Sequence, residues 1–195
     1  VGNGVGASGN IGRLATLTAH FPQAVPAYTV DMQCGSGLEA LTIAAAKIRS
    51  GQADLIVAGG VDSSSTAPRR AYNRNHPDYE RYGGEESFYS VAKFAPGEHD
   101  PYAMIRGAER VALDVQMTRQ ELNKWVLRSH SLAKQAREAG VLEPYLVGVQ
   151  GATADAGIRD RISERFLDKL PPLLPDGAIL TAGNTCLMHD GAAFL

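Results

Sequence analysis

The segment from Leu38 to Ile48 constrains the fold most, because apolar residues occupy almost every side of the helix that it predicts. Helical spacing is carried by Leu38, Leu41, Ala45 and Ile48, and alanine and threonine rather than charged residues fill most other positions. A helix that is apolar nearly all round is stable when other elements cover most of its surface. We therefore predict a core helix that ends at Gly51.

Two segments that flank this helix are predicted to be strands. Residues 27–30 form a short strand, and residues 54–61 are a continuous apolar run that ends at glycines, which is typical of a strand buried on both faces. Strand, helix and strand together predict a βαβ unit with a parallel pair and a right-handed crossover. The expected fold class is α/β.

Cys34 lies where the first predicted strand meets the helix. A helix start presents unpaired N–H groups and the positive end of the dipole, which stabilise a thiolate and lower the pKa of a cysteine. Gly35 and Gly37 leave room for a substrate to approach, and ligands gather at the carboxyl ends of parallel strands. A nucleophile is one role that fits this position, and a buried structural cysteine is the other.

Composition excludes several classes of function. A chain of 195 residues can form one domain or two. A net charge of −2 gives no reason to expect nucleic acid or a membrane surface as partner, and no apolar run approaches the roughly 20 residues that span a bilayer. The two cysteines lie far apart, which indicates a reducing cytosol. His76 and His99 have no partner at metal-ligand spacing, so no metal is predicted.

The N-terminal glycines allow an alternative. Gly4, Gly6 and Gly9 spell G-x-G-x-x-G, and Asp31 follows at about the distance typical of dinucleotide-binding folds. The strand that should precede these glycines is absent, which favours a loop ahead of a helix that is capped near Ser8 or Asn10. A nicotinamide site is retained only as an alternative.

The composition of the sequence changes after residue 68. Residues 69–102 are polar and rich in tyrosine and arginine, which indicates a surface loop or subunit contact. A capping box at Thr118 predicts a helix to about residue 139, with Trp125 in core packing and His130 at the surface or in a cap. Short strands are expected at residues 144–149 and 178–181, and the start of another buried strand at 188–195.

Four blocks in this order resemble the thiolase family, whose enzymes make or cleave 3-ketoacyl-CoA by thioester exchange. The first is Gln-Cys-Gly-Ser-Gly-Leu-Glu-Ala at residues 33–40, which resembles the family's nucleophile signature. The other blocks resemble parts of the family's loop domain and its closing motif, and they are residues 104–112, residues 119–130, and residues 179–184 followed by 190–193.

The resemblance implies a partial thiolase-like fold of the α/β class, with βαβ units of a mixed sheet, a buried nucleophile helix and an inserted, mostly helical loop domain. The nucleophile domain would comprise residues 1–62 and 178–195, and the loop domain residues 63–177. Because the family's opening strand and helix are missing, the chain is expected to be the N-terminal half of a thiolase, trimmed at both ends.

The resemblance also implies site residues. Cys34 matches the nucleophile that accepts the acyl group, and Met104 matches a residue of the acyl pocket. Arg159 matches an arginine at the nucleotide end of CoA, while Ala182 and Cys186 fall where the family places an alanine and a serine against the pantetheine. Cys186 replaces that serine, and Phe166 stands where another CoA-contacting serine is common.

The expected activity is that of an acyl-CoA acyltransferase, with CoA thioester as substrate and no further cofactor. The family's activating histidine, second cysteine and asparagine lie in a C-terminal half that residues 1–195 lack, so the chain alone is predicted to be inactive. A cytoplasmic homodimer or homotetramer is expected. The alternatives are a related condensing enzyme, the nicotinamide-binding domain, and a non-catalytic CoA-binding or assembly module.

Overall fold

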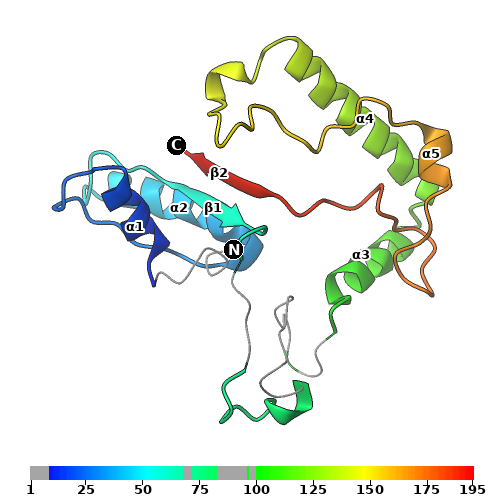
Figure 1. The fold of residues 1–195 in the computed structure, drawn as a ribbon, viewed down its shortest axis with the longest axis horizontal. Coiled ribbons are helices and arrows are strands. Elements are labelled where there is room, and N and C mark those ends of the chain that lie inside the picture. The colour runs from blue at the N-terminus through cyan, green and yellow to red at the C-terminus, as the bar shows by residue number, and fades with distance from the viewer. Residues whose placement is uncertain (1–8, 68–71, 83–95, 97–99) are drawn as a thin grey trace. The chain divides into compact units, whose positions relative to one another are not determined.

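The computed structural model describes residues 9–67, 72–82, 96 and 100–195. The chain divides into two compact units (Figure 1). The first unit comprises Val1–Ser90 and Met188–Leu195, and the second comprises Val91–Leu187.

In the first unit, the predicted central helix is confirmed. Helix α2 runs over Ser36–Arg49, directly after a 3-10 turn, η1, at Gln33–Gly35. Its end is set by Gly51, which adopts a φ of 71° that glycine tolerates best.

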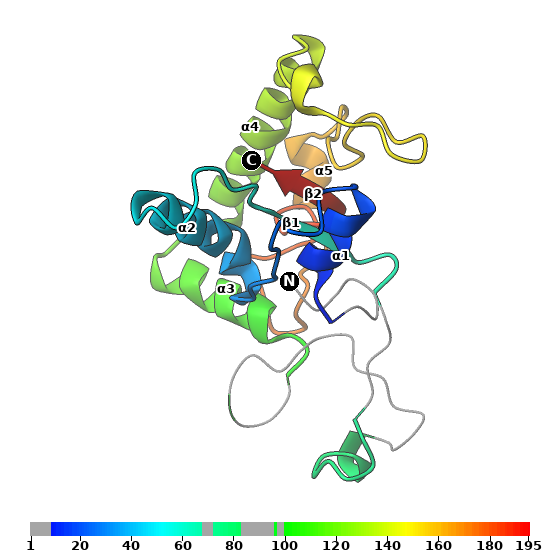
Figure 2. The same cartoon turned by 90° about the vertical axis from the view of Figure 1, so that its left-hand side faces the viewer.

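The predicted burial of α2 is not met within this chain. Helix α2 packs against strand β1 (Figure 2), and Ala44 is its one buried residue. Leu38 is 70% exposed, and Leu41 and Ile48 are also exposed. The helix itself forms as predicted, but the described residues cover only part of its apolar surface.

The sheet of the first unit is a two-stranded antiparallel pair (Figure 1). Strand β1, Gly59–Ser63, pairs with β2, Asp190–Phe194, so that Val61 lies opposite Ala192. Residue 59 must be small, because a Cβ there would overlap the backbone and side chain of β2. The prediction of a strand at residues 188–195 is therefore confirmed, but its predicted burial is wrong, because all five residues of β2 are exposed. The strand predicted from residue 54 begins only at Gly59 and is not buried on both faces as predicted.

Helix α1, Ile11–Thr18, begins where the sequence predicts a cap. The Asn10 side chain accepts a hydrogen bond from the Arg13 N–H at 3.0 Å. Gly4 and Gly6 of the alternative dinucleotide motif lie outside the described residues.

The predicted parallel pair between residues 27–30 and 54–61 is not formed among the described residues. Residues 27–30 make no strand pairing and lie instead beside the start of α1. Asn10 Nδ2 donates to the Ala27 carbonyl at 3.4 Å, and Thr29 Oγ1 accepts from the Gly12 N–H at 3.0 Å. Side chains and a helix end thus take up hydrogen-bonding groups that a neighbouring strand would otherwise use. A further 3-10 turn of this unit, η2, spans Glu80–Tyr82.

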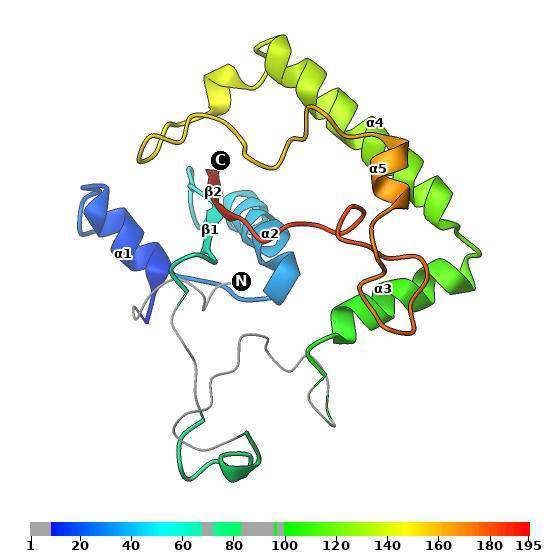
Figure 3. The same cartoon turned by 45° about the vertical axis from the view of Figure 1, so that its right-hand side comes forward.

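Helices are the regular structure of the second unit (Figure 3), and they cover less than half of its residues. Its helices are α3 at Ala103–Asp114, α4 at Arg119–Glu138 and α5 at Glu164–Asp168, with a 3-10 turn, η4, at Glu143–Tyr145. The strands predicted at 144–149 and 178–181 are wrong, because these segments form only the isolated bridges Val149–Ala152 and Pro172–Thr181. Local turns pair the N–H groups of Tyr145 and Leu146, and the N–H groups of residues 178–180 donate to a side chain of α3 instead.

Helices α4 and α5 lie side by side (Figure 3). The Arg119 guanidinium donates to the carbonyls of Leu167 and Asp168, at 2.6 and 3.2 Å, where the end of α5 leaves carbonyls unpaired. Asn123 donates from Nδ2 to the Asp168 carboxylate at 2.9 Å. Leu167 and Asn123 are fully buried at this contact.

Trp125 on α4 is 61% exposed, so its predicted core packing is wrong. The guanidinium of Arg128 lies over its ring, 5.4 Å from the ring centre.

The predicted capping box of α4 is confirmed. Thr118 Oγ1 accepts from the Glu121 N–H at 3.2 Å, and the Glu121 carboxylate accepts from the Thr118 N–H at 2.8 Å. These bonds satisfy donors that a helix start leaves unpaired.

Replacing Thr118 by alanine is expected to lower the free energy of unfolding by about 1 kcal/mol, the usual effect of losing such a cap. Urea denaturation followed by Trp125 fluorescence measures the change. Thr118→Ser keeps the hydroxyl and should lie close to wild type; equal losses in both variants would show that the hydroxyl does not cap α4.

Candidate functional site

The first candidate site is the cysteine turn, which we define as residues 31–36. Asp31 accepts from the Gln33 N–H at 2.8 Å, and Gln33 has a φ of 53°, which turns the chain sharply. Ser36 Oγ accepts from the Met32 N–H at 2.8 Å and donates to the Gln33 carbonyl at 2.7 Å. The Ser36 side chain thus ties the two sides of the turn together around Cys34.

The Cys34 thiol is exposed and free. It sits in η1, immediately before the first turn of α2, as the sequence predicted. None of the described residues forms a hydrogen bond with its sulfur, so this turn contains a reachable thiol without an adjacent base. A thiol so placed can attack an electrophile once it loses its proton.

The second candidate site is the 178–186 loop, which the carboxylate of Glu109 anchors. Glu109 lies on α3 and is 7% exposed. Its two oxygens accept from the N–H groups of Ala178, Ile179 and Leu180, at 2.7, 2.9 and 2.9 Å. Burial raises the pKa of Glu109, but the three backbone hydrogen bonds outweigh it and bring the pKa below its ordinary value of 4.5.

The next residues of the loop form a tight turn. The fully buried Thr181 donates its N–H to Asn184 Oδ1 at 2.8 Å. Asn184 Nδ2 returns a bond to the Ile179 carbonyl at 2.9 Å. Gly183 packs so closely that a Cβ there would lie 2.6 Å from Leu167 Cδ2. The backbone of the loop is therefore fixed by side chains of its own and by α3.

A cavity of about 300 Å³ lies between this loop and α4. Its walls are Trp125, Val126, Ser129 and His130 on one side and Gly183, Asn184 and Thr185 on the other. His130 connects the cavity to a third segment, because its Nδ1 accepts from the Arg159 N–H at 3.1 Å.

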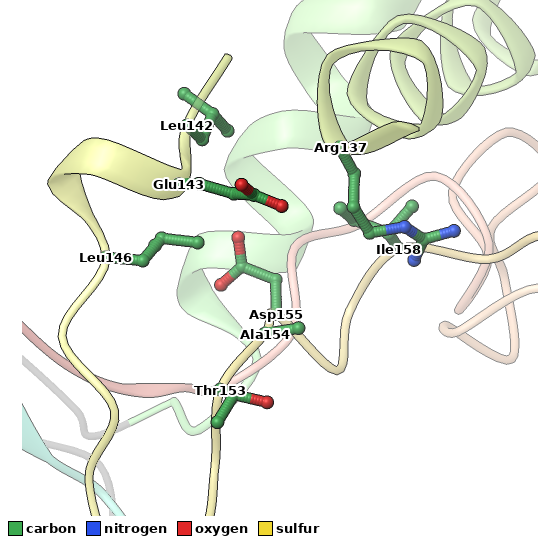
Figure 4. Close-up of a pocket in the computed structure, with 8 residues that line it drawn as sticks. All are labelled: Arg137, Leu142, Glu143, Leu146, Thr153, Ala154, Asp155 and Ile158. Atoms are coloured by element: carbon green, nitrogen blue, oxygen red, sulfur yellow. The ribbon is translucent and has the colours of Figure 1, made fainter. Parts of the chain in front are cut away.

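Another cavity of the second unit has two acidic side chains in its lining (Figure 4). It measures about 120 Å³ and is lined by residues of α4, of the η4 region and of the 153–158 segment. The carboxylates of Glu143 and Asp155 both point into it (Figure 4), while the guanidinium of Arg137 pairs with Asp160. Its acidic lining is unsuited to a phosphate-bearing ligand, and none of the predicted site residues lines it.

The predicted site residues fall into two groups. Ala182 belongs to the loop that forms one cavity wall, and Cys186 follows that wall directly; both are exposed. Arg159 is exposed and is joined to the cavity through His130. Met104, near the start of α3, is 62% exposed and does not line the cavity. Cys34 belongs to the first unit.

Sequence reasoning assigned no role to Glu109 and no contact to His130. The sequence does carry a signal for Glu109. On α3, Ile105 precedes it by four residues and Ala112 follows it by three, so this acidic residue lies on the apolar face of the helix. No comparable signal marked His130, since its partner lies 29 positions away.

The described residues contain no cluster of three or more histidine, cysteine or acidic side chains that could hold a metal ion. In the same residues, no helix combines the length and apolar character needed to cross a membrane.

Comparison with known families and sequences gives a consistent result. The family model described as the thiolase N-terminal domain matches residues 1–195. The VraB protein of Staphylococcus aureus (strain MSSA476), whose name places it among acetyl-CoA C-acetyltransferases, is 37% identical over 199 residues that cover all of this chain and 51% of VraB. A Staphylococcus epidermidis VraB is 36% identical with the same coverage. The chain spans about half the length of these relatives.

Solved structures give the same fold. The Acat5 thiolase of Ascaris suum, solved in complex with coenzyme A, matches with a TM-score of 0.80 and 25% identity, over 96% of this chain and 49% of that one. The acetyl-CoA acetyltransferase of Bacillus anthracis matches with a TM-score of 0.75 and 29% identity, over 95% and 49% of the two chains. The predicted partial thiolase-like α/β fold is confirmed.

The hydrogen bonds of Glu109 make stability depend on pH. Its pKa is lowered in the folded chain, so its contribution is complete above the ordinary value of 4.5 and is lost as pH falls through the lower folded value. Glu109→Gln should lower the urea midpoint of unfolding at pH 7, and the difference from wild type should shrink below pH 4.5. Glu138→Gln, an exposed change, serves as control. A difference that is independent of pH would contradict the anchoring role of the charge.

Proposed function

The chain belongs to the thiolase family, and from that membership we propose that Cys34 is the nucleophile of an acyl-CoA acyltransferase that forms or thiolyses 3-ketoacyl-CoA. The observation that carries the proposal is the cysteine turn, which presents an exposed thiol at the start of α2 within a chain matched by the family's N-terminal domain. The proposed acyltransferase activity is supported by the position of the Cys34 thiol at the start of α2 and by membership of the thiolase family.

In the proposed first step, the Cys34 thiolate attacks the thioester carbonyl of acyl-CoA. A bond forms between Sγ and the acyl carbon, the bond from that carbon to the CoA sulfur breaks, and CoA leaves as a thiolate that takes up a proton. Negative charge develops on the carbonyl oxygen, and the backbone N–H of Cys34 is proposed to help bind it. In synthesis the acyl group then passes to the carbanion of a second acyl-CoA. In thiolysis Cys34 instead attacks the 3-keto carbonyl of 3-ketoacyl-CoA, the bond between C2 and C3 breaks, the acyl-CoA carbanion that leaves takes up a proton, and the acyl group on Cys34 passes to CoA.

The second unit is proposed to bind CoA. Arg159 suits the nucleotide end, because a guanidinium can bind phosphate or stack on adenine. Ala182 and Cys186 are proposed to contact the pantetheine, and Met104 the acyl group. Support comes from the 300 Å³ cavity beside the 178–186 loop and from the Ascaris suum structure, which was solved with coenzyme A. The proposed domains remain residues 1–62 with 178–195, and 63–177.

The complete exchange is proposed to require residues beyond those of this chain. Among the described residues Cys34 has no hydrogen-bonded base, and repeated turnover, unlike one slow attack by a thiolate, needs groups that move protons. The chain covers about half of its curated relatives. We propose that the 195 residues alone do not turn over, and that the active form is a cytoplasmic homodimer or homotetramer without a cofactor other than its CoA substrates.

Incubation with acetyl-CoA tests the nucleophile. We expect intact-mass analysis to show a slowly formed acetyl adduct that Cys34→Ala abolishes and Cys186→Ala retains, since attack needs only the thiolate. Steady-state formation of acetoacetyl-CoA should be absent. An adduct that is unchanged in Cys34→Ala would overturn the assignment; a chain that binds CoA without forming any adduct would support the non-catalytic CoA-binding module instead.

Arg159→Gln tests the CoA site. Loss of one charge-assisted contact should weaken CoA binding about tenfold in isothermal titration calorimetry, in line with the roughly 1.5 kcal/mol of such a bond. Arg161→Gln removes the same charge from an exposed residue two positions away and should change affinity little. Equal effects of both changes would mean that general charge, and not Arg159, attracts CoA.

A further inference from the structure

His130 joins two parts of the second unit that the proposed function uses. On α4, its ring forms part of the wall of the 300 Å³ cavity, opposite Gly183, Asn184 and Thr185. Its Nδ1 is also the acceptor for the Arg159 N–H at 3.1 Å. The backbone of Arg159 is thereby tied to the cavity wall by a single hydrogen bond from a titratable side chain.

This hydrogen bond requires one protonation state of the ring. A backbone N–H can only donate, so Nδ1 must carry a free lone pair and the proton of a neutral imidazole must reside on Nε2. When the ring takes up a second proton, both nitrogens become donors and the bond to Arg159 is lost. Histidine is the side chain whose charge ordinarily changes between pH 5 and 8.

The charged groups on the elements around His130 do not replace the lost bond. The facing loop residues Gly183, Asn184 and Thr185 carry no charge. On the third segment, the Arg159 guanidinium would repel an imidazolium, and the Asp160 carboxylate is engaged by Arg137. On α4 itself, Arg128 lies over Trp125, and Lys134 pairs with Glu138 at 3.7 Å.

We propose that neutral His130 is a positioning residue that holds Arg159 beside the cavity, and that protonation of His130 releases Arg159 and weakens CoA binding. The inference rests on the proposed function, because it takes Arg159 as a CoA contact. His130 itself need not touch CoA; it acts through the backbone of Arg159.

The test compares the wild-type 195-residue chain with His130→Asn and His130→Ala. An asparagine side chain can place its amide oxygen near the position of Nδ1, where it accepts a hydrogen bond but does not titrate. In calorimetry with CoA, wild-type affinity should fall roughly five- to tenfold from pH 7.5 to pH 5.5, the effect of about one hydrogen bond. His130→Asn should show little of this fall, and His130→Ala should bind weakly at both pH values.

His130→Asn also controls for the ionisation of CoA, which is the same for every variant. If the affinity for CoA falls between pH 7.5 and pH 5.5 by the same factor in wild type and in His130→Asn, the inference is overturned and the proposed CoA site stands. Circular dichroism at both pH values identifies any variant that fails to fold.

A second measurement needs no CoA. The NMR signal of the Arg159 amide proton should move upfield as the wild-type chain is acidified from pH 7.5 to pH 5.5, since the hydrogen bond is lost, and it should stay in place in His130→Asn. An Arg159 amide signal that behaves the same in wild type and in His130→Asn would overturn the inference. If wild type fails to bind CoA at any pH, the proposed function fails, and the Arg159 signal still decides whether His130 holds this backbone.

Discussion

The second unit depends on one buried carboxylate. Glu109 accepts three backbone hydrogen bonds from residues 178–180, where an unpaired N–H group would be costly to bury. These bonds fix the start of the 178–186 loop on α3, and Thr181 and Asn184 then shape the turn that forms one wall of the larger cavity. The charge of one α3 side chain therefore determines where the proposed CoA contacts on this loop lie.

The sequence predicted the elements that are specified locally. Helix α2, the capping box at Thr118 and the position of Cys34 at a helix start all follow from residues within a few positions of one another. Strand pairing was predicted less well, because an extended segment such as residues 27–30 takes its hydrogen bonds from whichever groups lie beside it. Trp125 was assigned to the core because apolar spacing indicates which face is apolar and not whether anything covers that face.

The candidate sites also divide into parts that neighbouring residues specify and parts that depend on distant contacts. The cysteine turn could be located from the sequence because all its hydrogen bonds lie within residues 31–36. The partners of Glu109 lie about 70 positions along the chain, and Arg159 lies 29 positions from His130. Such contacts depend on how helices and loops pack, which a periodic pattern does not encode. The family resemblance supplied Arg159 and Ala182 as candidates, and the structure added the residues that fix their backbone.

The antiparallel sheet of the first unit bears on how the chain folds. Ser65, just after β1, donates a hydrogen bond to Asp190 in β2 across 125 positions, and the sequence of the whole second unit comes between the two strands. Closing so long a segment has an entropic cost that grows with its length, and distant pairings of this kind form slowly. During synthesis on the ribosome, β1 emerges well before its partner and stays an open strand edge until residues 190–194 appear.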